Sequence, residues 1–158
     1  MKQVDFYLIS NRLRDAKYKL ASRLANKLKR LDQKALLVTN SAQESEMLSS
    51  IMWSLRDTSF LAHERIDQIK SAAQLQADYE SGLNYAVIGD ALGMKASLLD
   101  TKFDVMINLS REVPLFSHHF TRIAEIVESD DDSKAEARAR YKLYQGEGFK
   151  LATHTLEL

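Results

Sequence analysis

The stretch VDFYLISNRLRDAKYKLASRLANKLKRLDQKALLVT, residues 4–39, contains the pattern that decides the fold. It opens with a short apolar run at 4–9, continues with a segment of helical periodicity at 15–31, and ends with a second apolar run at 35–39. The middle segment has leucines at the spacing of one helix face: Leu20, Leu24, Leu28 and Leu31. Short apolar runs that alternate with amphipathic helices are typical of a sheet covered by helices. The stretch therefore predicts a strand, a helix and a second strand of an α/β fold.

The rest of the chain continues this alternation. A second helix is predicted over 44–55, and the polar stretch 64–81, with its alanines and glutamines, has the composition of another. Three further runs are short, apolar and bounded by polar residues, as buried strands are: 85–88, 103–109 and 123–127. The length of the last run also permits a helix. We expect a single Rossmann-like α/β domain over 1–158, with a largely parallel central sheet flanked by helices.

Length and composition narrow the class of protein. The 158 residues suit one domain with a sizeable core, and 22 basic against 22 acidic residues argue against a surface built as a whole to hold nucleic acid. The absence of cysteine excludes disulfides and thiolate zinc sites, and it fits a reducing compartment. Charges at Lys2, Asp5 and Arg12 interrupt any secretory leader, and no apolar run approaches the roughly 20 residues of a membrane span. We therefore expect a soluble, cytoplasmic protein without a membrane contact.

The sequence lacks the usual motifs for nucleotide binding, nucleophilic catalysis and metal binding. The loop after the first strand, residues 10–14, has no glycine, and GDALG at 89–93 lacks the lysine and serine of a phosphate-binding loop. There is no Gly-x-Ser-x-Gly motif and no cysteine nucleophile, and the histidines lack the spacing of metal ligands on one helix face. We expect a protein that is not an enzyme and needs no cofactor or metal. A small nucleotide-binding α/β domain or enzyme with a degenerate loop is the alternative.

Charge is unevenly distributed along the chain. Residues 11–30 hold eight basic residues and one acid, Asp15, whereas the stretch 128–132 is acidic. The basic segment can steer an acidic partner or contact a phosphate backbone, or it can be a solvated helix face. The acidic stretch is placed to meet the positive end of the last predicted helix.

That last helix is predicted from SKAEARARYKLYQGEGF, residues 133–149. Ser133 and Glu136 have the spacing of a capping box at its start, and Gly146 suits the left-handed position just beyond its end. Arg138, Tyr141 and Lys142 fall on one face of such a helix, with Lys134 one turn earlier. Cations around one aromatic side chain suit an acidic peptide with an apolar end, although a solvated face has the same spacing.

Three pieces of the sequence, in this order and spacing, resemble the signatures of one family: VDFYLI at 4–9; Trp53 followed by Phe60 and His63; and ARARYKLY at 137–144 followed by Gly148, Phe149 and Thr153. That family is the chi subunit of bacterial DNA polymerase III holoenzyme. The chain is similar to the family in length, and the stretch 64–81 looks like an insertion relative to it.

The resemblance implies a non-catalytic accessory subunit of the clamp-loader complex in DNA replication. Such a subunit bridges the clamp loader, through the psi subunit, to the acidic C-terminal tail of single-stranded DNA-binding protein. The residues that the resemblance and the helix spacing assign to the tail are Lys134, Arg138, Tyr141, Lys142 and Val127. DNA is then expected to be reached only indirectly, because no aromatic platform accompanies the basic residues of 11–30.

A second surface follows from the same resemblance. It implies that Trp53 and Phe60 face the psi subunit and that a helicase can compete for that surface. The chain departs from the family's usual pattern at two places: Ala62 stands where a proline commonly precedes the histidine, and Gln145 stands where an arginine often follows the second tyrosine.

Overall fold

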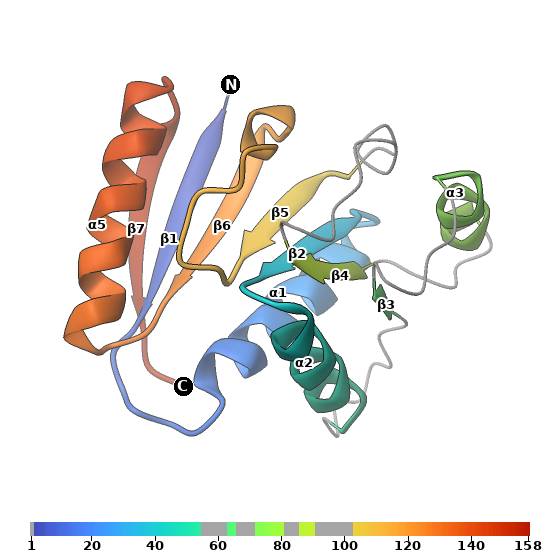
Figure 1. The fold of residues 1–158 in the computed structure, drawn as a ribbon, viewed down its shortest axis with the longest axis horizontal. Helices are drawn as coiled ribbons and strands as arrows, with labels where there is room; N and C mark the ends of the chain where they lie inside the picture. Colours follow the sequence, from blue (N-terminus) through green and yellow to red (C-terminus); the bar gives the residue numbers. More distant parts are fainter. Residues whose placement is uncertain (1, 55–62, 66–71, 81–85, 91–102) are drawn as a thin grey trace.

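The computed structural model describes residues 2–54, 63–65, 72–80, 86–90 and 103–158. The elements follow one another in this order: β1 (Gln3–Ile9), α1 (Ala16–Arg30), β2 (Ala35–Thr39), α2 (Ala42–Ser54), β3 (His63–Arg65), α3 (Ala72–Glu80), β4 (Ala86–Asp90), β5 (Val105–Asn108), β6 (Arg122–Val127), α5 (Asp131–Gly146) and β7 (Lys150–Leu156). Strands and helices alternate over most of the described chain (Figure 1).

The strands form one sheet in the order β3-β4-β2-β5-β6-β1-β7. All strand pairings within the described residues are parallel. The α/β class and the largely parallel, Rossmann-like sheet predicted from the sequence are therefore confirmed. The apolar run at 123–127 lies within β6 and is a strand, which removes the helical alternative for that run.

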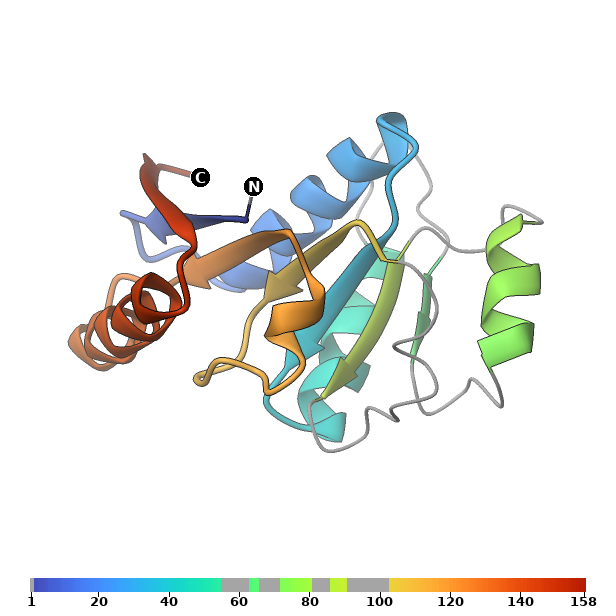
Figure 2. The same cartoon turned by 90° about the horizontal axis from the view of Figure 1, so that it is seen from above.

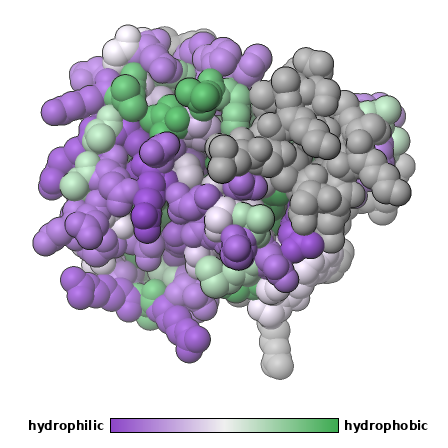
Figure 3. Space-filling model, viewed as in Figure 1, coloured by the Kyte–Doolittle hydropathy of each residue, from purple (hydrophilic) through white to green (hydrophobic). Residues whose placement is uncertain are grey.

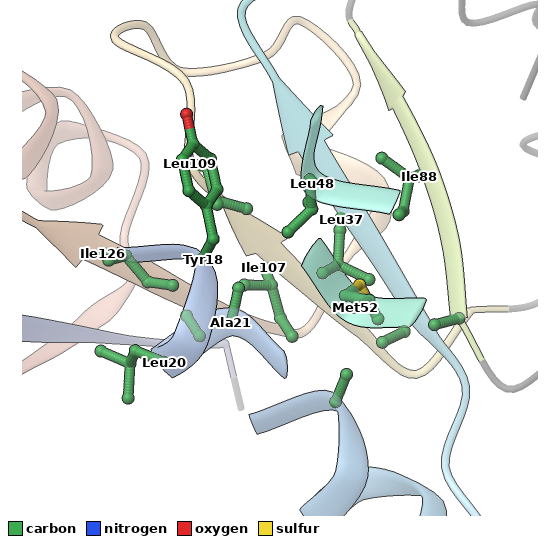
Figure 4. Packing of buried hydrophobic residues seen from close by; sticks show 14 of the residues in the cluster. Tyr18, Leu20, Ala21, Leu37, Leu48, Met52, Ile88, Ile107, Leu109 and Ile126 are labelled. Atoms are coloured by element: carbon green, nitrogen blue, oxygen red, sulfur yellow. The ribbon is translucent and has the colours of Figure 1, made fainter. Parts of the chain in front are cut away.

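Helices cover the sheet on both faces. Figure 2 shows α1 on one side of the sheet and α5 on the other. On the α1 side, α1 and α2 pack against side chains of the central strands, among them Leu37, Ile88 and Ile107 (Figure 4). On the α5 side, the core includes Phe6 of β1 and Phe120 of the segment after β5. Each fully buried Leu, Ile or Phe stabilises the fold by roughly 1.5–3 kcal/mol.

Two strands were not predicted. β7 pairs in register with all of β1 and forms one edge of the sheet, and β3 forms the other edge beside β4. Both are polar, since edge strands have less surface to bury. The helix predicted over 64–81 is α3 in its second half, whereas Glu64 and Arg65 belong to β3 and 66–71 lie outside the described residues. No helix in the described part of the chain is long and apolar enough to cross a membrane.

Candidate functional site

The start of α5 differs from the sequence prediction. Asp130 is the N-cap, and its carboxylate accepts hydrogen bonds from the Ser133 backbone N–H at 2.9 Å and the Ser133 hydroxyl at 2.7 Å. The predicted capping box from Ser133 to Glu136 is therefore wrong, because an aspartate three residues earlier takes the cap position. Asp131 and Asp132 lie in the first turn, where their charge meets the positive end of the helix as predicted.

The end of α5 also differs. Gly146 is the last helical residue, and the left-handed position is taken two residues later by Gly148, which has a φ of 86°. The Phe149 N–H bonds the Tyr144 carbonyl, closing the end of the helix. The turn leads directly into β7, so α5 and β7 are placed by one short connection.

One face of α5 is fixed to the sheet by a buried carboxylate, Glu125 of β6. Arg140 Nε donates to Glu125 Oε1 at 2.9 Å, and the Tyr144 hydroxyl donates to Glu125 Oε2 at 2.6 Å. Asn108 Nδ2 of β5 donates to the same Oε2 at 2.8 Å. Burial raises the pKa of Glu125, against the opposing effects of Arg140 and of the hydrogen bonds from Asn108 and Tyr144. Burial also raises the pKa of Tyr144, reinforced by the charge of Glu125, so the tyrosine stays a neutral donor.

The adjacent face of α5 borders a cavity of about 610 Å³. Its lining comes from α5, β1, β6 and β7: Phe6, Leu8, Val127, Lys134, Ala137, Arg138, Tyr141, Lys142, Gln145 and Thr153. We call this space the α5 cavity. All five side chains that the sequence assigned to the tail peptide line it. The structure thus brings them together, and it adds a floor from the sheet.

The α5 cavity combines an apolar floor with a cationic rim. Phe6 is 3% exposed, and its ring centroid lies 5.5 Å from that of Tyr141, which is 37% exposed. Lys134, Arg138 and Lys142 are exposed on the helix above. None of these three cations forms an ion pair within the described part of the chain. Their charge is therefore available to an incoming anion. In the space-filling view, the α5 side of the molecule is mostly hydrophilic with small apolar patches (Figure 3).

Of the sheet residues that form the floor of the cavity, the sequence assigned only Val127 to the site. Phe6 and Leu8 stand two apart in β1 and so point to one face of the sheet, and that alternation was the available signal. Thr153 belongs to β7, which pairs it with Phe6. The pairing of β1 with β7 joins the two ends of the chain and cannot be recognised from a local sequence pattern.

The structure describes only part of the second predicted surface, that of Trp53 and Phe60. Trp53, at the end of α2, is 51% exposed, and its ring centroid lies 4.3 Å from that of His63. His63 is buried and its Nε2 lies 2.9 Å from the Ser49 hydroxyl. Phe60 lies outside the described residues.

A second cavity, of about 430 Å³, lies at the carboxyl ends of β2, β5 and β6, where parallel α/β sheets commonly bind ligands. Five carboxylates line it: Glu44, Glu128, Asp130, Asp132 and Glu136. Its three lining cations are already engaged: Lys17 lies 2.9 Å from Glu44, Arg111 lies 3.9 Å from Glu136, and Arg140 is bonded to the buried carboxylate of β6. The described residues hold no group of three or more His, Asp or Glu side chains suited to a metal ion.

Comparison with known proteins identifies relatives over almost the full length. The family model described as DNA polymerase III chi subunit, HolC, matches residues 1–152. The chain is similar to DNA polymerase III subunit chi of Pseudomonas aeruginosa, at 31% identity over 157 residues covering 99% of this chain and 98% of that protein. It is also similar to DNA polymerase III subunit chi of Haemophilus influenzae, at 26% identity over 155 residues covering 98% of each.

Solved structures with a similar fold come from other proteins. The C-terminal domain of the DEAD-box protein Dbp5 matches with a TM-score of 0.61 at 12% identity, covering 98% of this chain and 90% of that one. T4 UvsW matches with a TM-score of 0.66 at 8% identity, covering 98% of this chain and 41% of that one. At these identities the likeness concerns the fold alone.

Proposed function

The chain belongs to the DNA polymerase III chi subunit family, as the resemblance in its sequence indicated, and on that premise we propose that its α5 cavity binds the acidic C-terminal tail of single-stranded DNA-binding protein. The observation that supports this most directly is a set of three cations around an apolar floor, Lys134, Arg138 and Lys142, which form no ion pair with any residue that the structure describes. As a non-catalytic subunit in the cytoplasm, the protein bridges that tail to the clamp loader through psi.

The chemistry of such a tail matches the cavity. The tail is acidic and ends in an apolar residue with a free carboxylate. Arg138 offers a forked donor pair to a carboxylate, and the two lysines supply point charges to the acidic residues. Phe6 and Tyr141 form apolar walls for the terminal side chain. Since the contact is partly ionic and the DNA-coating partner offers several tails, we expect modest, salt-sensitive affinity that multivalency strengthens.

Replacing Arg138 tests this site. We expect Arg138→Ala to weaken binding of the tail peptide by about 1–3 kcal/mol, the range for a charge-assisted hydrogen bond. The folding free energy should change little, because the arginine is exposed and has no ion pair in the described chain. Isothermal titration with the C-terminal peptide of the cognate protein gives the affinity, and urea unfolding gives the stability.

The matched control is Arg30→Ala, which removes the same charge from the exposed end of α1. If Arg138 binds the terminal carboxylate of the tail, a peptide with an amidated C-terminus should bind the wild-type protein more weakly than the free-acid peptide does. In Arg138→Ala the two peptides should bind with nearly equal affinity. Equal affinities of Arg138→Ala, Arg30→Ala and the wild type would remove the α5 cavity as the tail site.

We assign the psi subunit to a separate surface around Trp53 and Phe60, where a helicase can compete. In support, Trp53 is half exposed on α2, and a large exposed aromatic is a common interface anchor. Trp53 does not line the α5 cavity. The two contacts should therefore be separable by mutation.

Trp53→Ala is expected to weaken binding of the psi subunit by about 2 kcal/mol or more, the effect of truncating an interface hot spot, and so to reduce its recovery in a pull-down. Phe60→Ala should do the same if it belongs to this surface. Tail-peptide affinity should stay near wild type in both variants. A normal psi contact in both, or a parallel loss of tail binding, would contradict the assignment of two surfaces.

The rival function, nucleotide binding, is less well supported. The cavity at the carboxyl edge of the sheet has five carboxylates, and the partly buried Glu44 is held charged: burial raises its pKa, but hydrogen bonds from Asn40 and Lys17 outweigh this and lower it. Such a lining repels a phosphate. A thermal-shift screen with nucleotides tests the point, and stabilisation by any of them at submillimolar concentration would favour the rival.

A further inference from the structure

The face of β1 and β7 that lies opposite α5 has an unusual set of side chains. Strand alternation and the parallel register arrange it in rows: Lys150, Gln3 and Arg122; then Ala152, Asp5 and Ala124; then His154 and Tyr7. We call it the β1–β7 platform. On this side α1 contacts mainly β6 and β2, and its Leu24 and Leu28 line a hollow with Tyr7, so α1 covers the β6 side of the platform and leaves His154 of β7 exposed.

An aromatic pair, half-buried Tyr7 and exposed His154, stands on the platform. The rings of Tyr7 and His154 are stacked, with centroids 5.1 Å apart and planes at 22°. The His154 side chain is 46% exposed, and its Nε2 lies 3.0 Å from Asp5 Oδ1. Gln3 also donates to this carboxylate, at 3.1 Å. Asp5 is 7% exposed, so it holds the imidazole in place and shows little charge to solvent.

Two cations lie beside Tyr7. Lys27 of α1 and Arg122 of β6 line the same shallow hollow as Tyr7. Arg23 and Lys19 continue the exposed stripe along α1 at intervals of four residues. Within the described residues none of these four cations forms an ion pair. Within the basic segment 11–30, Lys17 is paired with Glu44 and Glu128, whereas the stripe Lys19, Arg23 and Lys27 is not neutralised by acids of the described residues.

We propose that the β1–β7 platform, with the basic stripe of α1, binds single-stranded DNA directly and without sequence preference. Direct contact with DNA was not expected from the sequence, because no aromatic platform accompanies the basic residues of 11–30 along the chain. The fold supplies Tyr7 and His154 from two strands at opposite ends of the chain. A ring face beside a row of cations suits a flexible strand, whose bases stack while its phosphates meet the lysines and arginines.

The platform and the α5 cavity lie on opposite faces of the same strand pair. When the tail of single-stranded DNA-binding protein occupies the α5 cavity, the platform therefore remains free to contact the single-stranded DNA that this protein coats. The two contacts are chemically distinct, and failure of one leaves the other measurable.

The test is fluorescence anisotropy of a labelled oligo-dT with the full chain across a salt series. We expect dissociation constants on the order of 10⁻⁵–10⁻⁴ M near physiological salt, tightening as salt falls. With three or four phosphates contacted, the slope of log K against log salt should be about −2 to −3. Lys27→Glu should weaken binding at least fivefold, and His154→Ala about tenfold, with His154→Phe recovering most of that loss.

The matched control is Arg111→Glu, the same charge change at an exposed arginine on the loop after β5. Its DNA affinity should stay within twofold of wild type, and tail-peptide binding by Lys27→Glu should be normal. Equal losses in Lys27→Glu and Arg111→Glu, or an unchanged His154→Ala, would overturn the proposal. Absence of binding even at low salt would also overturn it and leave the platform to a protein partner.

Discussion

Arg140→Leu is expected to lower the free energy of unfolding by about 3–5 kcal/mol, the cost of leaving one member of a buried ion pair uncompensated. Arg140 is almost fully buried and donates to Glu125, which is itself completely buried. Its Nη1 also donates to the Arg111 carbonyl at 2.9 Å, so the loss includes an anchor for the loop after β5. Urea unfolding measures the difference.

The loss should depend on pH. Burial already raises the pKa of Glu125 above that of an exposed glutamate, and the charge of Arg140 opposes this shift. Without Arg140 the pKa rises further. A carboxyl whose pKa is higher in the folded than in the unfolded state costs stability above its unfolded pKa, and the cost fades as the pH falls through the folded value. The defect of Arg140→Leu should therefore be largest at neutral pH and smaller near pH 5.

Two further variants isolate the cause. Arg138→Leu changes the neighbouring exposed arginine on the other face of α5, and its stability should stay within about 0.5 kcal/mol of wild type. Glu125→Gln with Arg140→Leu removes the uncompensated charge and keeps an acceptor for Tyr144, so it should recover at least about 1 kcal/mol at pH 7. A double variant as unstable as Arg140→Leu would mean that lost packing, not the carboxylate, causes the defect.

The sequence predicted the central sheet well because its strands are buried on both faces. β2, for example, is buried at every position, so its apolar run is visible without knowledge of its neighbours. β7 was missed because it lies at an edge, where KLATHTL is a mixture of polar and apolar residues with no buried position and no apolar run. The start of α5 was misplaced because serine and aspartate both suit the N-cap position, and the choice between them depends on the turn that follows β6. Its end was misplaced because two glycines lie close together, and the choice between them depends on the turn that leads into β7.

The candidate site divides in the same way. The cationic rim was predictable because it lies on one helix, where a spacing of three or four residues sets neighbours. The floor depends on register between β1 and β7, which are about 145 residues apart in the chain and pair only in the fold. The buried pair of Glu125 and Arg140 left one signal that was not used: a lone acid inside the apolar run RIAEIV.

Phe6→Ala should have the second large effect, because Phe6 serves both the core and the α5 cavity. It is 3% exposed and packs against Tyr141 and Tyr144, with centroids at 5.5 and 6.2 Å. Truncation of a buried phenylalanine costs about 3–5 kcal/mol. Since the side chain also forms the floor on which the terminal apolar residue of the tail is proposed to rest, peptide affinity should fall at least tenfold in the folded protein.

The matched control for this prediction is Phe120→Ala. Phe120 is also 3% exposed and belongs to the same core cluster, yet it does not line the α5 cavity. It should cost similar stability and leave tail affinity unchanged, as measured by titration at a temperature where both variants are folded. If either alanine variant fails to fold, Phe6→Leu and Phe120→Leu provide a milder pair, with the affinity loss again confined to Phe6. Equal peptide affinities in the two members of a pair would show that the tail does not reach the floor of the cavity.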